Sequence, residues 1–128
     1  MSTSSIAREG TGRTAEVLLW ILQIVTAILF FMAAYPKLTG APIMVDMFEK
    51  IGLGQWFRYL TGSLEAVGGI LLLIPGLAGF GALLLLMIMV GAVVTHLAIV
   101  GGNPFPAVTF LVLSGLIAWF RRYQVFRR

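Results

Sequence analysis

Hydrophobic positions are gathered into four long runs, and polar positions lie mainly between the runs and at the two chain ends. A transmembrane helix needs about 20 mostly apolar residues, within a range of about 17–25. Four stretches meet or approach this length: residues 16–35, 57–74, 77–100 and 107–120. The fourth is short unless it begins at Phe105. The pattern predicts an all-α integral membrane protein, built as a four-transmembrane-helix bundle.

Each run is expected to be helical, because backbone groups cannot stay unpaired in hydrocarbon. The runs are continuously apolar and lack the alternation of a membrane β-barrel. Pro36 is expected to end the first helix. Residues 1–15 are small and polar, and they are predicted to form a disordered cytoplasmic tail. Residues 16–120 form the predicted membrane domain, and residues 121–128 a basic cytoplasmic tail.

The one long connection, residues 36–55, carries a different pattern. Between residues 43 and 51, apolar side chains recur at helical spacing, while Asp46, Glu49 and Lys50 occupy the other face. We therefore predict a short amphipathic helix in this first outer loop, lying at the membrane interface. A helix that caps the bundle is the simpler interpretation, and a lid or gate is the alternative.

Composition strengthens the membrane interpretation and limits the chemistry. Of the 128 residues, 59% are hydrophobic and 11% charged, and the mean hydropathy is +1.00, whereas soluble domains carry roughly 25% charged residues. The absence of cysteine excludes thiol chemistry, covalently attached haem and cysteine-held iron–sulfur clusters. The single histidine excludes a multi-histidine metal site within one chain. No metal and no covalently bound cofactor is therefore expected.

Basic residues set the expected orientation. The net charge is +4, and six arginines lie in the two tails: Arg8, Arg13, Arg121, Arg122, Arg127 and Arg128. Four spans place both tails on one side, which the positive-inside rule makes the cytoplasmic side of a bacterial inner membrane. The four C-terminal arginines are predicted to anchor the chain to anionic lipid headgroups. No basic face with base-reading side chains is present, so membrane lipids rather than nucleic acid are expected partners.

Polar residues inside the predicted spans form the candidate site. Ionisable groups within a span cost at least about 2.5 kcal/mol each on insertion scales, so they mark either function or pairing. In the predicted orientation, five polar residues fall at similar depth in the outer half: Lys37, Arg58, Glu65, His96 and Asn103. We predict that Lys37, Glu65 and His96 meet there, together with Arg58 or Asn103, and bind a substrate.

Small residues accompany this cluster along the second run. Gly62, Gly68 and Gly69 share a helix face with Glu65 by i, i+3, i+4 spacing. We predict that they let a neighbouring helix pack closely. Gln23 lies in the inner half, apart from the cluster, and is expected to form an interhelical hydrogen bond.

Two interpretations of the polar cluster remain open. In a functional site, Glu65 and His96 would pass protons to or from a hydrophobic carrier such as a quinone, and Lys37 or Arg58 would hold the polar head of the carrier. In a structural site, the carboxylate would pair with a cation and the histidine with a neighbour. Such contacts fix the register of packed helices without any chemistry.

Four segments carry a recognisable order of motifs. They read AYPKL at residues 34–38, FEKIGL at 48–53, GSLEAVGGILL at 62–72 and GAVVTHL at 91–97. Their order and spacing resemble the DoxX-like family of small four-helix bacterial membrane proteins, over residues 16–120. The resemblance implies the four-helix membrane fold, and the positions that match the family pattern are these: Lys37, Glu65, Gly68, Gly69 and His96. Some relatives are named for a thiosulfate:quinone oxidoreductase subunit, and others are associated with membrane oxidoreductase complexes.

Three functions are compatible with these observations. The first is a subunit of, or an accessory to, a membrane oxidoreductase system, with a quinone-like carrier bound at the outer cluster. The second is a non-catalytic scaffold or assembly protein whose buried polar residues only hold the bundle together. The third is a small-solute or proton pathway, which requires a homo-oligomer because one bundle of this size has little room for a pore. The residues leave open whether the protein is an enzyme.

Overall fold

The computed structural model describes the backbone of residues 3–126 and the side chains of residues 12–126. This part of the chain is helical and contains no strand, which confirms the all-α prediction. The helices are α1 (Thr3–Thr39), α2 (Pro42–Ile51), α3 (Trp56–Leu72), α4 (Ala78–Thr95), the π-helical η1 (His96–Val100), α5 (Phe105–Phe120) and α6 (Tyr123–Phe126).

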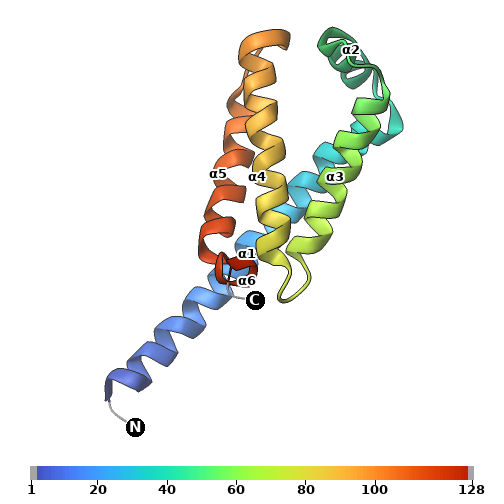
Figure 1. The fold of residues 1–128 in the computed structure, drawn as a ribbon. Helices are drawn as coiled ribbons and strands as arrows, with labels where there is room; N and C mark the ends of the chain where they lie inside the picture. Colours follow the sequence, from blue (N-terminus) through green and yellow to red (C-terminus); the bar gives the residue numbers. More distant parts are fainter. Residues whose placement is uncertain (1–2, 127–128) are drawn as a thin grey trace.

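Four long helices pack side by side in a cyclic order. Helix α1 contacts α3, α3 contacts α4, α4 contacts α5, and α5 returns to contact α1. Helices α3 and α4 lie close where the turn at residues 73–77 joins them, and they diverge toward the opposite end, where α2 lies (Figure 1). The divergence leaves α2 positioned across the wider end of the packed helices.

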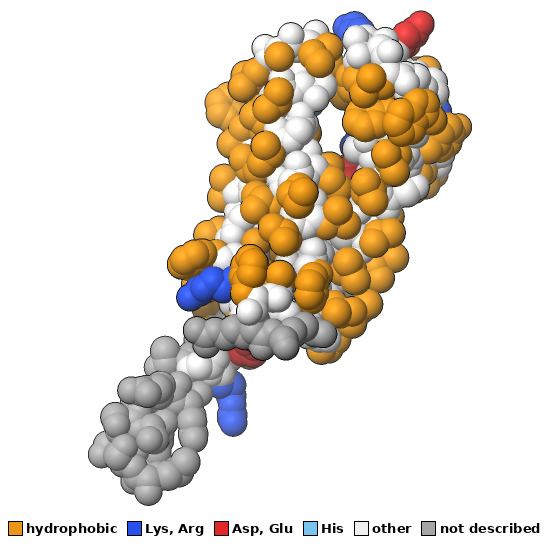
Figure 2. All heavy atoms as spheres, in the orientation of Figure 1, with side chains coloured by type: hydrophobic (Ala, Val, Ile, Leu, Met, Phe, Trp, Pro, Cys, Tyr) orange, Lys and Arg blue, Asp and Glu red, His pale blue; other side chains and the backbone are white. Residues whose placement is uncertain are grey.

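Two segments are long and apolar enough to cross a membrane. They are Gly12–Thr39, with 28 residues, and Ala78–Val100, with 23 residues. Helix α5 is apolar but shorter, and the 17-residue α3 contains both Arg58 and Glu65. Hydrophobic side chains cover most of the face in view over α3, α4 and α5 (Figure 2). So much exposed apolar surface is stable only against apolar surroundings.

The core lies where all four long helices meet. Its buried apolar side chains come from each of them: Ala27, Phe30, Leu72, Ala82, Leu85, Met89 and Ile117. Glycines bring α3 close to its neighbours. A Cβ atom on Gly68 would lie 2.5 Å from the Leu85 side chain, and one on Gly69 would lie 2.7 Å from Phe31. A Cβ atom on Gly62 would lie 3.0 Å from side-chain atoms of α1. All three glycines therefore lie at close helix contacts.

The sequence predicted that the first helix ends at Pro36. In the structure, the helix continues to Thr39. A proline removes one backbone donor and frees a carbonyl one turn earlier. Side chains in the last turn make bonds that hold it helical: the Thr39 hydroxyl donates to the Tyr35 carbonyl at 2.8 Å, and Lys37 Nζ donates to the Ala33 carbonyl at 3.2 Å. Lys37 consequently lies on a helix rather than in a loop.

Helix α2 and the N-terminal part of α1 were also the subject of sequence predictions. Helix α2 confirms the short helix expected between residues 43 and 51, and Gly52, with φ of 83°, ends it in the left-handed conformation that glycine adopts easily. Helix α1 already begins at Thr3, so residues 3–15, expected to be disordered, are helical, and residues 1–2 lie outside the described part.

Candidate functional site

A cavity of about 610 Å³ lies among α1, α2, α3, α4 and the start of α5. The space-filling view shows the molecule hollowed between α4 and the α2–α3 side, with basic and acidic atoms at the edge of the hollow (Figure 2). Most of the lining is apolar. The polar side chains that reach it are Lys37, Thr61, Glu65, Thr95 and His96. A volume of this size is typical of small-molecule sites.

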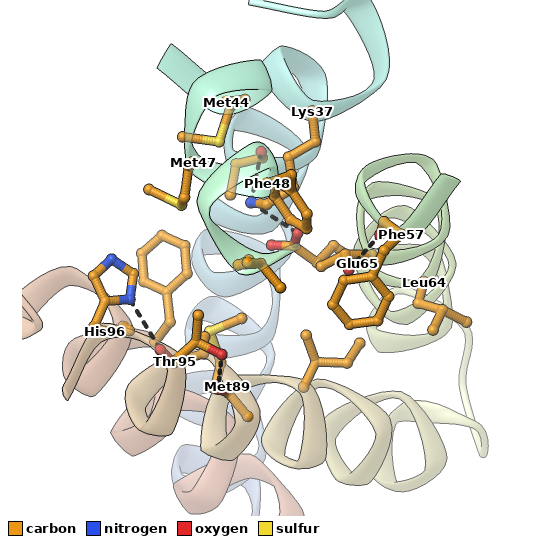
Figure 3. Close-up of a pocket in the computed structure, with 18 of the residues that line it drawn as sticks. Lys37, Met44, Met47, Phe48, Phe57, Leu64, Glu65, Met89, Thr95 and His96 are labelled. Atoms are coloured by element: carbon orange, nitrogen blue, oxygen red, sulfur yellow. Dashed lines mark hydrogen bonds and ion pairs between the residues drawn. The ribbon is translucent and has the colours of Figure 1, made fainter. Parts of the chain in front are cut away.

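Lys37 and Glu65 form an ion pair at the cavity wall. The Lys37 Nζ atom lies 2.9 Å from Glu65 Oε1, and the Glu65 side chain is fully buried, while 16% of the Lys37 side chain is exposed (Figure 3). Glu65 Oε2 has no hydrogen-bond partner among the described residues. Buried carboxylate oxygens normally have partners. The free Oε2 is therefore a position where a ligand could supply a donor.

Arg58 lies near this pair but does not line the cavity. Its side chain is only 4% exposed and donates to the Lys37 backbone carbonyl and, at 2.7 Å, to Gln55 Oε1. Arg58 was predicted as a residue that could hold a substrate, but in the structure its side chain lies outside the cavity. Instead, it ties the start of α3 to the end of α1, which holds Lys37 facing Glu65.

His96 lies at the junction of α4 and η1. Its Nδ1 atom lies 2.9 Å from the Ala92 carbonyl oxygen, as the dashed line in Figure 3 marks. A carbonyl only accepts, so Nδ1 carries the proton and Nε2 of the neutral ring is an acceptor. The π-helical turn that begins here closes with a 2.9 Å bond from the Gly101 amide to the His96 carbonyl. Such π turns recur at functional sites.

Asn103 lies apart from the main cavity. It lines a second hollow of about 520 Å³, between α2 and the loop that follows η1, which Asp46, Lys50 and His96 also line. Asn103 Oδ1 accepts a 3.0 Å hydrogen bond from the Phe105 amide at the start of α5. The structure thus brings Lys37, Glu65 and His96 to one cavity, as predicted from their depth, whereas Asn103 and Arg58 lie outside it.

Helix α2 contributes an apolar wall to the cavity that was not among the sequence predictions. Four side chains at i, i+3, i+4 and i+7 spacing line the cavity: Met44, Met47, Phe48 and Ile51. Figure 3 shows Met47 and Phe48 beside the cavity, with the Lys37–Glu65 pair beyond Phe48. Their helical spacing was visible in the sequence and predicted an amphipathic helix at the outer interface that caps the bundle, but it did not show that these side chains line a cavity. The stripe faces inward because α2 folds back over the end of α3.

A second polar network lies at the opposite end of the helices, around Arg121. Its Nε atom donates to Gln23 Oε1 at 2.7 Å, Nη1 donates to Glu16 at 3.0 Å and to the Tyr123 hydroxyl at 2.8 Å. Gln23 also donates to the Leu72 carbonyl at 2.8 Å, which confirms its predicted interhelical bond. Burial favours a lower pKa for Arg121, but the hydrogen bonds to Glu16 and Tyr123 outweigh it, so the pKa is raised.

The C-terminal arginines therefore do not behave alike. Arg121 is 3% exposed and bonds inward, which differs from its predicted role as a lipid anchor. Arg122 lies at the surface, with its guanidinium 4.1 Å from the centre of the Trp119 ring. Arg127 and Arg128, also predicted anchors, lie outside the described residues.

Comparison with known proteins gives one family and one distant relative. The sequence model of the DoxX-like family matches residues 21–121, a range that includes Lys37, Glu65 and His96. A curated Bacillus subtilis (strain 168) protein named "Putative oxidoreductase CatD" is 25% identical over 84 residues, which are 66% of this chain and 63% of that protein. The match thus spans less than two thirds of the relative's length. No solved structure matches the chain.

Proposed function

This chain belongs to the DoxX-like family, and from that premise we propose that it is a membrane protein associated with an oxidoreductase system, whose cavity binds the polar head of a quinone-like carrier. One observation carries the proposal: the buried Lys37–Glu65 pair, with a free carboxylate oxygen, at the wall of an otherwise apolar cavity. The name of the Bacillus subtilis relative supports the oxidoreductase context.

The proposed topology has four spans. Two segments meet the length and hydropathy of a span, and α3 and α5 pack alongside them with 17 and 16 residues, about 24–26 Å at 1.5 Å per residue. That length approaches the roughly 30 Å of a bilayer core. Both ends of the chain would then face the cytoplasm of a bacterial inner membrane. A C-terminal alkaline phosphatase fusion should be inactive in cells and a fluorescent-protein fusion bright; the reverse would refute this orientation.

The cavity suits a carrier with an apolar ring and a small polar head. Its apolar lining includes methionines and phenylalanines, which pack well against a flat ring. Lys37 and Glu65 lie on one side and His96 on another (Figure 3). In this arrangement Lys37 and Glu65 would orient the head of the carrier, and His96 would accept a proton from it. The isoprenoid tail would lie between the helices or in lipid.

A scaffold function is the second candidate, and specific contacts favour it. The Lys37–Glu65 ion pair and the bond from Arg58 to the Lys37 carbonyl both join α1 to α3. Contacts of this kind hold packed helices in register. A scaffold function, however, gives no reason for a free buried oxygen beside a cavity of about 610 Å³.

The two functions separate in a lipid-extraction experiment. The full chain is purified in mild detergent without added quinone, and the extract is assayed for total quinone by mass spectrometry. We expect a bound quinone with the wild type and its loss with Glu65→Gln and His96→Ala, while Thr109→Val, an exposed position on α5 outside the cavity, retains it. No quinone in any sample, together with loss of folding in both cavity variants, would favour the scaffold.

A further inference from the structure

Most of the polar atoms that the cavity offers to a ligand are hydrogen-bond acceptors, and few are donors. We propose that the cavity prefers the reduced, dihydroxy form of a quinone-type carrier to the oxidised dione. This inference rests on the proposed function, and it concerns only which redox form binds. It follows from a count of the hydrogen-bond donors and acceptors that each polar side chain leaves available to a ligand.

Glu65 offers only acceptors. Its carboxylate is paired with the Lys37 ammonium at 2.9 Å through Oε1, and an ionised carboxylate has no proton to donate. The second oxygen, Oε2, is buried and lacks a hydrogen-bond partner among the described residues. A ligand that donates a hydrogen bond would satisfy this oxygen, whereas a ligand carbonyl would face it lone pair to lone pair.

His96 also offers an acceptor. Because Nδ1 donates to the Ala92 carbonyl, Nε2 of the neutral ring bears a lone pair, and no hydrogen bond occupies it within residues 12–126. Figure 3 shows the ring on the α4 side of the cavity, away from the Lys37–Glu65 pair. Acceptors therefore lie on two sides of the cavity.

The two threonines of the lining do not supply donors. The Thr61 hydroxyl donates to the Phe57 carbonyl at 2.8 Å, and the Thr95 hydroxyl donates to the Gly91 carbonyl at 2.7 Å. Both bonds lie within the threonine's own helix, so only lone pairs remain on these oxygens.

Lys37 is the one lining side chain among the described residues that keeps a proton to donate. Its ammonium donates to the Ala33 carbonyl at 3.2 Å and lies 2.9 Å from Glu65 Oε1, so at least one of its three N–H groups remains available to a ligand. A hydroxyl can accept from this group and donate elsewhere, so a quinol can satisfy Lys37, Glu65 and His96 together. A dione can satisfy Lys37 alone and leaves the other two without partners.

The test compares two redox forms of one molecule. The full chain in lipid nanodiscs is titrated anaerobically with a short-chain ubiquinol and, separately, with the ubiquinone of the same tail, and Kd is measured for each. We expect the Kd of the quinol to be lower than that of the quinone by roughly tenfold or more, because a hydrogen bond to a charged group contributes that much binding free energy. Equal affinity, or tighter binding of the quinone, would overturn the inference and leave the proposed function intact. Binding of neither form would overturn both.

Substitutions assign the preference to the residues named. Glu65→Gln introduces an amide that donates, so the quinol preference should fall toward equality or reverse, and His96→Phe should reduce it while keeping a ring of similar size. The control Thr109→Val should retain the full preference. Thermal unfolding of each variant shows whether it is folded. If Glu65→Gln does not fold, a His96→Phe protein with unchanged preference would still contradict the part assigned to His96.

Discussion

The Glu65 carboxylate and the Lys37 ammonium depend on each other inside the packed helices. Each charge alone would be costly in an apolar environment, and at 2.9 Å they compensate one another. The two residues come from α1 and α3, so their pairing also fixes how these helices face each other. The site and the fold therefore share the same side chains.

Removing one partner should be far more damaging than removing both. Lys37→Met leaves a buried, unpaired carboxylate and should lower the free energy of unfolding by about 3–5 kcal/mol. The double variant Lys37→Met/Glu65→Leu should recover most of this loss, because no uncompensated charge remains. Denaturant unfolding in detergent measures both. A double variant as unstable as Lys37→Met would show that the loss of stability does not come from an unpaired buried carboxylate.

The position of the Lys37–Glu65 pair could be predicted from the sequence, but which polar residues lie beside it could not. Depth in the bilayer follows from position along a helix, so Lys37, Glu65 and His96 could be grouped from the sequence. Direction around the helix axis and the course of the loops are set by packing, and depth alone does not give them. That is why Arg58 and Asn103, at similar predicted depth, lie outside the cavity.

The close contacts between helices occur at glycines, which have no side chain. Helix α3 approaches α4 at Gly68 and α1 at Gly69, with no room for a Cβ atom at either. The small-residue face was predictable because its spacing is a helical period. The end of α1 was not, because the bonds that continue the helix past Pro36 involve its own last turn and Arg58 of another helix.

A methyl group on α3 should separate helices. Gly68→Ala places a Cβ atom 2.5 Å from Leu85, within the core, and should destabilise the protein by about 1–3 kcal/mol. The matched control is Gly115→Ala on α5, where the nearest atom lies 3.7 Å away and the gain in helix propensity should make the change neutral or favourable. Thermal unfolding compares them. Equal effects at both positions would contradict the close α3–α4 contact.

The Arg121 network joins the C-terminal segment to α1. Arg121→Ala removes the donor to buried Gln23 Oε1, and an unsatisfied buried acceptor should cost about 1–3 kcal/mol. Arg122→Ala, at the exposed neighbouring position, should change stability little. Chemical denaturation measures both, and limited proteolysis should cut the Arg121→Ala chain faster after residue 120. If Arg122→Ala proved the more damaging, the inward role of Arg121 would be wrong.

For the molecule as a whole, the cavity is a consequence of topology. Helices α3 and α4 are joined by a short turn and diverge away from it, and α2 folds over the open end (Figure 1). The sequence predicts the helical class and the order of helices from the blocks of apolar residues. It does not predict the cavity, because the divergence of two helices depends on contacts between residues distant in the chain.

We propose that a quinone-type carrier occupies this cavity. The most direct test is photolabelling with a short-chain quinone that carries a photoreactive azide on its ring. The probe is presented in both redox states to the protein in nanodiscs, and the labelled residues are identified. We predict labels on the cavity-lining Met47, Leu64 or Met89, suppressed by excess unlabelled carrier. Labels confined to the exposed Val90 and Val94 on the outer surface of α4, and unaffected by competitor, would contradict the claim.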